Sequence, residues 1–436
     1  MPAKDAAQQP AGWIPARSFA PPKLRGLIWR SLARIAPGAA RRYHDHLIRE
    51  QVRRCRPARA DGPLTMIGAF ELNIGIARAA QILCSSMEAA GLPVYPMDCS
   101  AVLRPMPGPP ARRPAAPAHG TMVFCVNPPQ MAPLLTHFGP RICRGKRLVG
   151  YWWWELDRLP RAWMRWAELM DEIWVSSRFI HDTFVRELPR KAIRYVPLCV
   201  PEPAPSAAAR GDFGLQPHPF TVLVAFDLSS HWERKNPRGA IAAFRRAFPD
   251  AAAAQLVLKV SGASQHPEHL EALRALTADM GNVRIIPDNL PEGDLAALIR
   301  SCDVLLSLHR AEGLGLFISE AMWLGTPVIA TAWSGVLDML SEDNALLVRC
   351  RPVPVRPSDY PSVMPGASWA EPDLEHAAEC LRRLAADAGL RSRLRVAARQ
   401  RAEVLFSADQ FRDVAGSLLR PLGEPRDPSA SKRGTS

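Results

Sequence analysis

Short apolar runs alternate with amphipathic stretches along most of the chain. Runs that predict buried strands lie at 64–68, 92–95, 121–126, 147–151, 172–175 and 193–196, and again at 221–225, 254–260, 283–286, 304–308 and 328–330. Stretches with helical spacing lie between them, at 74–90, after Ser176, and at 236–248, 269–280, 293–301 and 317–324. Strands that alternate with helices predict a doubly wound, mostly parallel α/β sheet.

A proline- and alanine-rich stretch, Pro201 to Ala209, divides this pattern into two similar halves. Helical spacing returns at the end, over 374–387, 390–405 and 407–419. The pattern therefore predicts two Rossmann-like domains that face one cleft. The expected organisation is a basic N-terminal extension (1–60), a first domain (61–205) with a proline-rich loop near 104–117, a second domain (206–405), a C-terminal helix (406–420) and a disordered tail (421–436).

The first 60 residues are basic and are expected to be irregular. Within them, 23–35 has apolar residues near helical spacing and an arginine-rich face. Contact with an anionic membrane surface is one interpretation. A solvated tail, or a helix packed on the body, is the other. The chain shows no signal-peptide core and no apolar run near the ~20 residues of a spanning helix, which predicts a cytoplasmic protein, either soluble or peripheral to the inner membrane.

Composition narrows the functional class only slightly. In the 436 residues, 47% are hydrophobic and 22% are charged, as in an ordinary globular protein. The net charge of +13 is compatible with nucleic acid, anionic lipid or phosphorylated substrates. No zinc spacing or nucleic-acid motif supports the first of these. The nine cysteines form no CxxC pair and several lie in apolar runs, which predicts buried free thiols in a reducing compartment.

The segment 303–322 carries the strongest chemical signal. A buried strand leads into the loop Glu312-Gly313-Leu314-Gly315, and a helix that contains Glu320 follows. Ligands of open α/β sheets bind beyond the carboxyl ends of strands, and glycines let backbone N–H groups approach them closely. The helix N-terminus favours phosphate, and carboxylates accept hydrogen bonds from sugar and ribose hydroxyls. By spacing alone, two unrelated glutamates remain the alternative.

A second signal joins a strand to a helix at 227–237. It contains the basic pair Arg234 and Lys235 just before Asn236-Pro237. Arginine offers forked charge-assisted hydrogen bonds and lysine a mobile point charge, so the pair suits a diphosphate. An ordinary basic helix start is the alternative, although cations there oppose the helix dipole. Lys259 lies near the end of the next strand. A lysine there is more often an exposed surface residue, and a place in the lining of the cleft is the alternative.

The segment 312–330 closely resembles the Glu-x7-Glu signature of glycosyltransferase family 4, with its following Glu-Ala-Met and Gly-x-Pro-Val-Ile. The resemblance implies a GT-B fold of two Rossmann-like domains, whose C-terminal helix returns to the first. It implies that Glu312 contacts the transferred sugar, that Glu320 holds the ribose, and that amides of Gly313, Leu314 and Gly315 meet the sugar and diphosphate. The piece around Arg234 and Lys235 looks like the family's phosphate-binding loop. One departure is Phe317, where proline is common in the family.

The first half resembles the same family less closely. The loop 71–78 is similar to its Gly-x-Gly-x-Ala-Arg loop, which implies donor contacts for Asn73 and Gly75, with Asn73 where glycine is common. Many relatives carry a site histidine near the end of the strand before Trp152-Trp153-Trp154. Here Glu155 occupies that neighbourhood, and a catalytic role for it is a hypothesis. The three tryptophans either present indole faces to a sugar or form packed core.

The resemblance implies a retaining transferase that needs no metal or other cofactor. The expected substrates are a nucleotide-sugar carrying a hexose of the mannose, rhamnose or glucose class and a glycan or lipid-linked acceptor in bacterial polysaccharide biosynthesis. A non-catalytic nucleotide-sugar or glycan-binding protein on the same fold is the alternative. Binding to nucleic acid, suggested only by the charge, is not expected.

Overall fold

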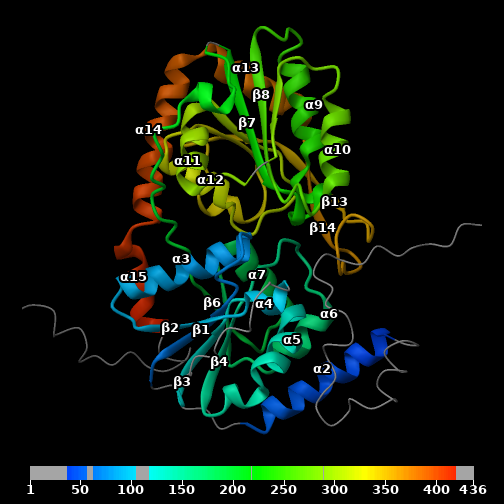
Figure 1. The fold of residues 1–436 in the computed structure, drawn as a ribbon, viewed down its shortest axis with the longest axis vertical. Helices are drawn as coiled ribbons and strands as arrows, with labels where there is room; N and C mark the ends of the chain where they lie inside the picture. Colours follow the sequence, from blue (N-terminus) through cyan, green and yellow to red (C-terminus); the bar gives the residue numbers. More distant parts are fainter. Residues whose placement is uncertain (1–36, 56–61, 105–116, 218, 288, 419–436) are drawn as a thin grey trace, which may run out of the picture.

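The computed structural model describes residues 37–55, 62–104, 117–217, 219–287 and 289–418. Two α/β domains, each with a parallel six-stranded sheet, lie one above the other (Figure 1), which confirms the predicted pair of Rossmann-like domains. The expected helix at 23–35, most of the proline-rich loop and the tail 421–436 lie outside the described residues. Among the described helices, none combines the length and apolar character needed to cross a membrane.

The first domain is built on a parallel six-stranded sheet in the order β2-β1-β3-β4-β5-β6. Its strands are β1 (Leu64–Gly68), β2 (Val94–Asp98), β3 (Gly120–Phe124), β4 (Lys146–Tyr151), β5 (Glu172–Val175) and β6 (Ala192–Tyr195). Its helices are α2 (Pro37–Arg53), α3 (Gly75–Ala89), α4 (Ser100–Leu103), α5 (Pro128–Phe138), α6 (Arg161–Ala167) and α7 (Arg178–Glu187), with a 3-10 turn η2 (Pro140–Cys143). Met66 and Ile67, successive residues of β1, join different core clusters, so both faces of the sheet are buried.

The second domain has a parallel sheet in the order β9-β8-β7-β10-β11-β12. Its strands are β7 (Phe220–Asp227), β8 (Ala254–Ser261), β9 (Val283–Ile286), β10 (Val304–Ser307), β11 (Val328–Thr331) and β12 (Leu346–Val348). Its helices are α8 (Trp232–Lys235), α9 (Pro237–Ala247), α10 (Pro267–Leu276), α11 (Glu292–Ser301), α12 (Leu316–Trp323) and α13 (Leu374–Ala386), with 3-10 turns η3 (Arg210–Phe213), η4 (Leu228–Ser230) and η5 (Ser334–Asp338). Strand order reverses between β7 and β10, which is where such sheets bind ligands.

An antiparallel hairpin, absent from the predicted elements, follows β12. It pairs β13 (Cys350–Pro354) with β14 (Ser368–Pro372) and belongs to neither six-stranded sheet. Its loop extends toward the first domain in Figure 1, and Val355, Tyr360 and Ala367 are buried in that domain's core cluster. The hairpin thus belongs to the second domain by sequence and to the first by packing.

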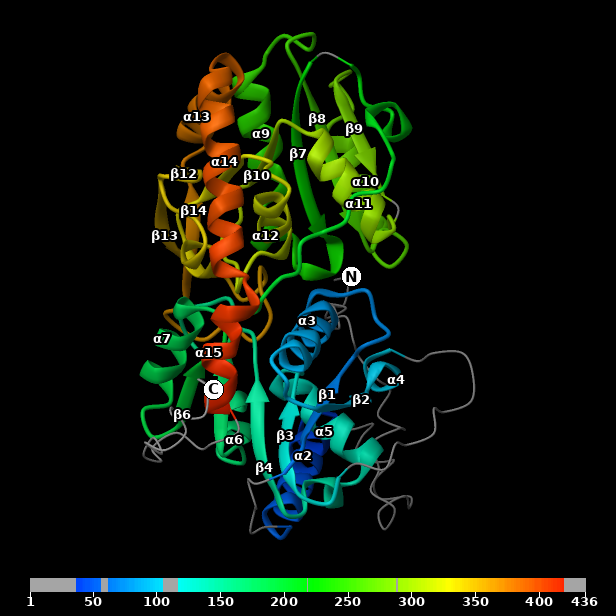
Figure 2. The ribbon, with the colours of Figure 1, turned by 90° about the vertical axis from the view of Figure 1, so that its left-hand side faces the viewer.

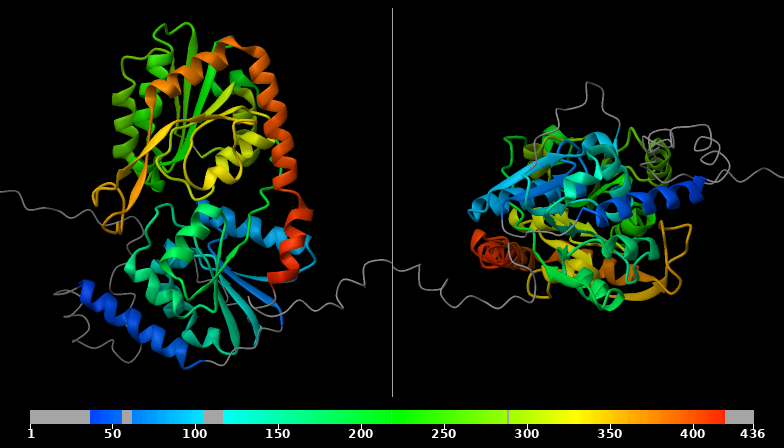
Figure 3. Two further views of the ribbon diagram at one scale, coloured as in Figure 1. Left: turned by 180° about the vertical axis from the view of Figure 1, so that it is seen from behind. Right: turned by 90° about the horizontal axis from the view of Figure 1, so that it is seen from below.

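The end of the chain crosses back to the first domain, as predicted. Helix α14 (Ala388–Leu405) runs along the second domain, and α15 (Ala408–Leu418) packs against α3 of the first (Figures 2 and 3). Two arginines of the first sheet bind the last carbonyls of α15. Arg147 Nη1 donates to Leu418 O at 2.8 Å, and Arg194 Nη1 donates to Ser417 O at 2.6 Å. These cations also suit the negative end of the helix dipole.

Both arginines share one buried carboxylate. Glu172 forms ion pairs with Arg147 and Arg194, and the exposed fractions of the three side chains are 2%, 3% and 10%. Because the three side chains are buried, water cannot take the place of the carboxylate as a partner of the two arginines. Its loss would leave two buried guanidinium groups without a counter-charge.

We therefore expect Glu172→Ala to lower the free energy of unfolding by about 3–5 kcal/mol. Urea unfolding followed by circular dichroism measures the change. Glu202→Ala is the control, because Glu202 pairs with Arg399 at the surface and exposed pairs contribute only about 0–1 kcal/mol. Equal losses in the two variants would contradict the role given to the buried triad.

The expectation of an irregular chain up to residue 60 is wrong for α2, which is a regular helix. It packs on α5 and η2 through the buried side chains of Ile48 and Val52, four residues apart and so on one face. His44 Nε2 lies 3.1 Å from Thr136 Oγ1 of α5. Because this stretch contains many arginines, its small apolar face is not apparent from the sequence pattern.

Three smaller expectations are settled by burial. Lys259 is 2% exposed, so its interpretation as a surface lysine is wrong; its ammonium donates to Val260 O and Ser261 Oγ, both at 3.2 Å. The tryptophans at 152–154 are buried in the core rather than offered to a sugar. All nine cysteines lie in the described residues and are free thiols, six of them buried.

Candidate active site

The loop after β10 holds Glu312 at the carboxyl edge of the second sheet. Glu312 is 7% exposed, and helix α12 begins four residues later at Leu316. Gly315 caps that helix with a φ of 94°, a left-handed conformation that favours glycine. Glu320 lies in the second turn of α12. The sequence pattern therefore folds locally as expected: strand, glycine loop, helix.

The loop after β7 brings the basic pair to the same edge. Arg234 and Lys235 end the short helix α8, and Asn236, at a left-handed φ of 52°, begins α9 by accepting from Gly239 N at 3.1 Å. The Asn236 amide also donates to Leu308 O at 2.9 Å, which ties the β7 loop to the β10 loop. The basic pair therefore has a fixed place beside Glu312.

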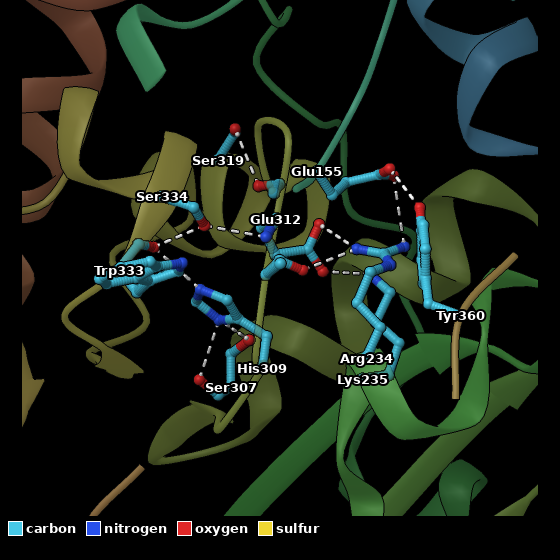
Figure 4. A network of polar contacts seen from close by, with 12 residues as sticks. Glu155, Arg234, Lys235, Ser307, His309, Glu312, Ser319, Trp333, Ser334 and Tyr360 are labelled. Atoms are coloured by element: carbon cyan, nitrogen blue, oxygen red, sulfur yellow. Dashed lines mark hydrogen bonds and ion pairs between the residues drawn. The ribbon is translucent and has the colours of Figure 1, made fainter. Parts of the chain in front are cut away.

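Glu312 is the centre of an ion-pair network (Figure 4). Lys235 Nζ contacts Glu312 Oε1, and Arg234 Nη1 lies 3.3 Å from Glu312 Oε2 and donates to Ala311 O at 2.8 Å. Burial opposes ionisation of Glu312, but the two cations outweigh it and lower its pKa to about 2. The carboxylate is therefore charged at every working pH. For Arg234, Glu312 and Glu155 outweigh burial and raise the pKa, whereas for Lys235 burial prevails and lowers it.

A second layer of polar contacts fixes the Glu312 backbone. Its N–H donates to Ser334 Oγ at 2.9 Å, and its carbonyl accepts from Gly335 N at 3.0 Å. A Cβ on Gly335 would collide with the Gly313 carbonyl oxygen, so only glycine fits there. Below them His309 is buried, with Nε2 3.2 Å from Trp333 O. The sequence interpretation missed these supporting residues, and the position of His309 directly after a buried strand was the only signal.

Glu155 of the first domain reaches the same network from the opposite domain. Its Oε1 lies 3.7 Å from Arg234 Nη2, and its Oε2 accepts from the Tyr360 hydroxyl at 2.6 Å. A Cβ built on Gly313 would lie 3.8 Å from Glu155 Cγ. The structure thus brings Glu155 together with Arg234, Lys235, Glu312 and Gly313.

Glu320 stands apart from this network and has a different environment. Burial raises its pKa to about 7, with a further increase from Glu292 and an opposing effect from Arg78. Arg78 of α3 and Glu292 of α11 form an ion pair at 3.0 Å that joins the two domains. The two glutamates of the signature therefore differ in charge state, one ionised and one near its titration midpoint at neutral pH.

Two of the remaining predicted residues lie at the surface of the first domain. Asn73 and Gly75 are exposed at the start of α3, the helix that carries Arg78. A small pocket, partly open to solvent, lies at the ends of β7 and β10. Its lining includes Lys235, Glu312, Gly315 and Phe317. The pocket thus coincides with the reversal of strand order.

The described residues contain one group with ligand atoms close enough for a metal ion, His266, Glu268 and His269. It lies at the start of α10, with His266 Nδ1 3.3 Å from Glu268 Oε1. None of the three side chains contacts Glu312 or the basic pair, so this group is separate from the candidate active site.

Comparison with known proteins relates the second domain, which carries Glu312 and the basic pair, to glycosyltransferases. Residues 226–401 match the family model described as "Glycosyl transferases group 1". A D-inositol 3-phosphate glycosyltransferase of Salinispora arenicola is 33% identical over 190 residues, which is 42% of this chain and 37% of that protein. The corresponding protein of Acidothermus cellulolyticus is 28% identical over 215 residues, 47% of this chain and 45% of that protein. The matches thus span less than half of these curated relatives, and they support a relationship to group 1 glycosyltransferases.

Solved structures resemble the chain over both domains. Sucrose-phosphate synthase from Thermosynechococcus elongatus superposes with a TM-score of 0.60 at 18% identity, over 83% of this chain and 98% of that one. Anabaena Alr3699/HepE, solved in complex with UDP and glucose, gives 0.58 at 13% identity, over 82% and 99%. At such identities the likeness concerns the fold alone. The fold is GT-B, as expected.

Proposed function

We propose that this chain is a retaining glycosyltransferase. In this proposal it moves a hexose-type sugar, of the mannose, rhamnose or glucose class, from a nucleotide-sugar to a glycan or lipid-linked acceptor in polysaccharide biosynthesis. The observation that carries the proposal is the ionised Glu312, held by Lys235 and Arg234 beside a pocket at the reversal of strand order. Relationship to group 1 glycosyltransferases supports it.

The proposed roles follow from charge and position. Breaking a glycosidic bond to a diphosphate leaves positive charge on the sugar and negative charge on the leaving group. Glu312 supplies a fixed negative charge for the first, and the basic pair supplies positive charge for the second. Amides of Gly313, Leu314 and Gly315 complete the proposed donor site.

Glu320 is assigned to the ribose, one helical turn or more from the reacting centre. Asn73 and Gly75 approach the donor from the first domain in this proposal, and Glu155 acts on the facing side of the cleft. The proposed location is the cytoplasm, with the basic start of the chain available to an anionic inner membrane. HepE, which was solved with UDP and glucose, supports a nucleotide-sugar as the donor.

A screen of nucleotide-sugars tests the proposal. We expect one class, among UDP-, GDP- and dTDP-linked hexoses, to raise the unfolding midpoint of the wild-type protein, and that same compound to yield nucleoside diphosphate over time. No stabilisation by any member would contradict the proposal. Stabilisation without product would favour the alternative, a non-catalytic binding protein.

The pKa of Glu320 predicts how donor binding depends on pH. A carboxylate accepts hydrogen bonds from two ribose hydroxyls, whereas the protonated acid accepts them less well. With a pKa of about 7, binding to the ionised form alone would make the apparent affinity about tenfold tighter at pH 8 than at pH 6. Calorimetric titration with a nucleotide-sugar measures this, because the diphosphate diester does not titrate in that range.

Glu320→Gln is the control, and its affinity should be nearly independent of pH. The same shift acts on stability with the opposite sign. The folded protein keeps a proton that the unfolded chain releases above its ordinary pKa of 4.5, so Glu320 makes the ligand-free fold less stable as pH rises from about 4.5 to 7. An equally pH-dependent affinity in the Gln variant would exclude Glu320 as the titrating group.

A further inference from the structure

The β13–β14 hairpin connects the two domains at the candidate active site. Its root belongs to the second domain, where Arg310, just after β10, bonds Glu371 of β14 at 2.8 Å and Glu233 of α8 at 3.0 Å. Arg310 N also donates to Arg234 O at 2.8 Å, and Ala370 N donates to Arg310 O at 2.9 Å. The hairpin is therefore fixed to both loops that carry the ion-pair network.

The far end of the hairpin is buried in the first domain. Tyr360 is 5% exposed, and its ring meets the Trp154 ring edge-on with centroids 5.5 Å apart. At the return of the loop, Ser368 donates to Asp157 twice, from N at 2.8 Å and from Oγ at 2.5 Å. The segment 154–157 is thus held at both ends by a hairpin that begins beside Arg234.

One contact of the hairpin enters the network itself. The Tyr360 hydroxyl donates to Glu155 Oε2 at 2.6 Å, while the other oxygen of the same carboxylate faces Arg234 at 3.7 Å. A carboxylate held on one oxygen cannot rotate freely, so the second oxygen keeps its direction toward Arg234. Arg234 in turn lies between two carboxylates, Glu155 and Glu312, from different domains.

We propose that the β13–β14 hairpin is an interdomain strap and that Tyr360 is a positioning residue, which orients Glu155 and through it Arg234. The strap holds the first domain in a fixed position relative to the loops that carry Glu312 and Arg234. That Arg234 binds the diphosphate of a nucleotide-sugar rests on the proposed function. The hydroxyl is the decisive atom, because the ring alone would still fill the space against Trp154.

Tyr360→Phe tests this by removing only that atom. We expect turnover of the nucleotide-sugar found in the screen to fall about tenfold or more, as for loss of a hydrogen bond to a charged group, while UDP or GDP binds within about threefold of wild type. A residue with a merely structural role would not separate kcat from nucleotide affinity. Tyr95→Phe, at an exposed tyrosine of β2, is the matched control and should behave as wild type.

A second readout does not require activity. Amide hydrogen exchange over residues 151–160 should be faster in Tyr360→Phe than in wild type, and faster in Ser368→Ala as well, because each loses an anchor of the strap. Tyr95→Phe should leave this segment unchanged.

The outcomes separate the two proposals. Full turnover in Tyr360→Phe, or loss of nucleotide affinity equal to the loss of turnover, would overturn the positioning role. If the wild type turns over no nucleotide-sugar, the proposed function fails. Faster exchange at 151–160 in the two variants would still support the strap, and unchanged exchange would overturn it.

Discussion

Glu312→Gln is expected to lower turnover of the nucleotide-sugar about 10²- to 10³-fold while the protein still binds the nucleotide. The pKa of about 2 keeps the wild-type carboxylate charged, and its loop is fixed by Ser334 and Gly335. Glutamine keeps the size and loses the charge. The developing positive charge on the sugar would then lack its counter-charge, which affects kcat more than donor affinity. Steady-state release of nucleoside diphosphate measures both.

Two controls accompany this variant. Glu342→Gln, at an exposed position beyond η5, should retain wild-type rates. The unfolding midpoint of Glu312→Gln must also be measured, because the variant leaves Arg234 and Lys235 without their shared counter-charge. A folded Glu312→Gln protein with a rate within tenfold of wild type would contradict the role of Glu312.

Lys235→Ala is expected to have the next largest effect, a loss of about 10²-fold in kcat/KM. The ammonium is within reach of Glu312 and lines the pocket, so a bound diphosphate would meet it directly. Lys235→Arg should recover part of the loss, because it keeps the charge but not the shape. Arg246→Ala, at the exposed end of α9, is the control for an arbitrary loss of positive charge. Unchanged KM and kcat in Lys235→Ala would place the diphosphate elsewhere.

The double variant Lys235→Ala/Glu312→Gln adds a test of the pairing. Because the two side chains form an ion pair in the ligand-free protein, their losses should not add. We expect the double variant to be no more than about tenfold slower than the worse single variant. Strict additivity would mean that the two residues act independently.

Local patterns predicted the strands and helices that carry the site. The strands at 172–175 and 283–286 have the predicted bounds, and α12 begins within one residue of its prediction. In each case the signal that predicts the element, a buried apolar run or a glycine cap, lies within the segment itself. The same is true of the Glu312 loop, whose glycines and neighbouring strand are contiguous in the sequence.

The missed features either contain prolines that hide their local pattern or depend on contacts between distant segments. Strand β13 contains Pro352 and Pro354, and none of its residues is buried, so neither propensity nor alternation marks it as a strand. Helix α5 begins with two prolines and contains Pro133, which conceals its helical spacing. Tyr360 and Glu155 are 205 positions apart, and no local pattern joins them.

The burial of single residues in the folded chain also changes how those residues are interpreted. Lys259 at a strand end suggested exposure, but β8 is covered on both faces and the side chain lies inside. The difference between Glu312 and Glu320 could not be predicted from their spacing. One lies between two cations, and the other lies in a half-buried position where Arg78 only partly offsets the cost of charge.

The most direct test of the account follows the sugar itself. Wild-type protein is mixed with a nucleotide-sugar, radiolabelled in the sugar, that stabilises it in the screen. We predict repeated release or transfer of the labelled sugar, with one nucleoside diphosphate formed per sugar. Label that stays in the intact nucleotide-sugar, bound to the protein but never released from the diphosphate, would contradict the assignment of this site as a glycosyltransferase centre.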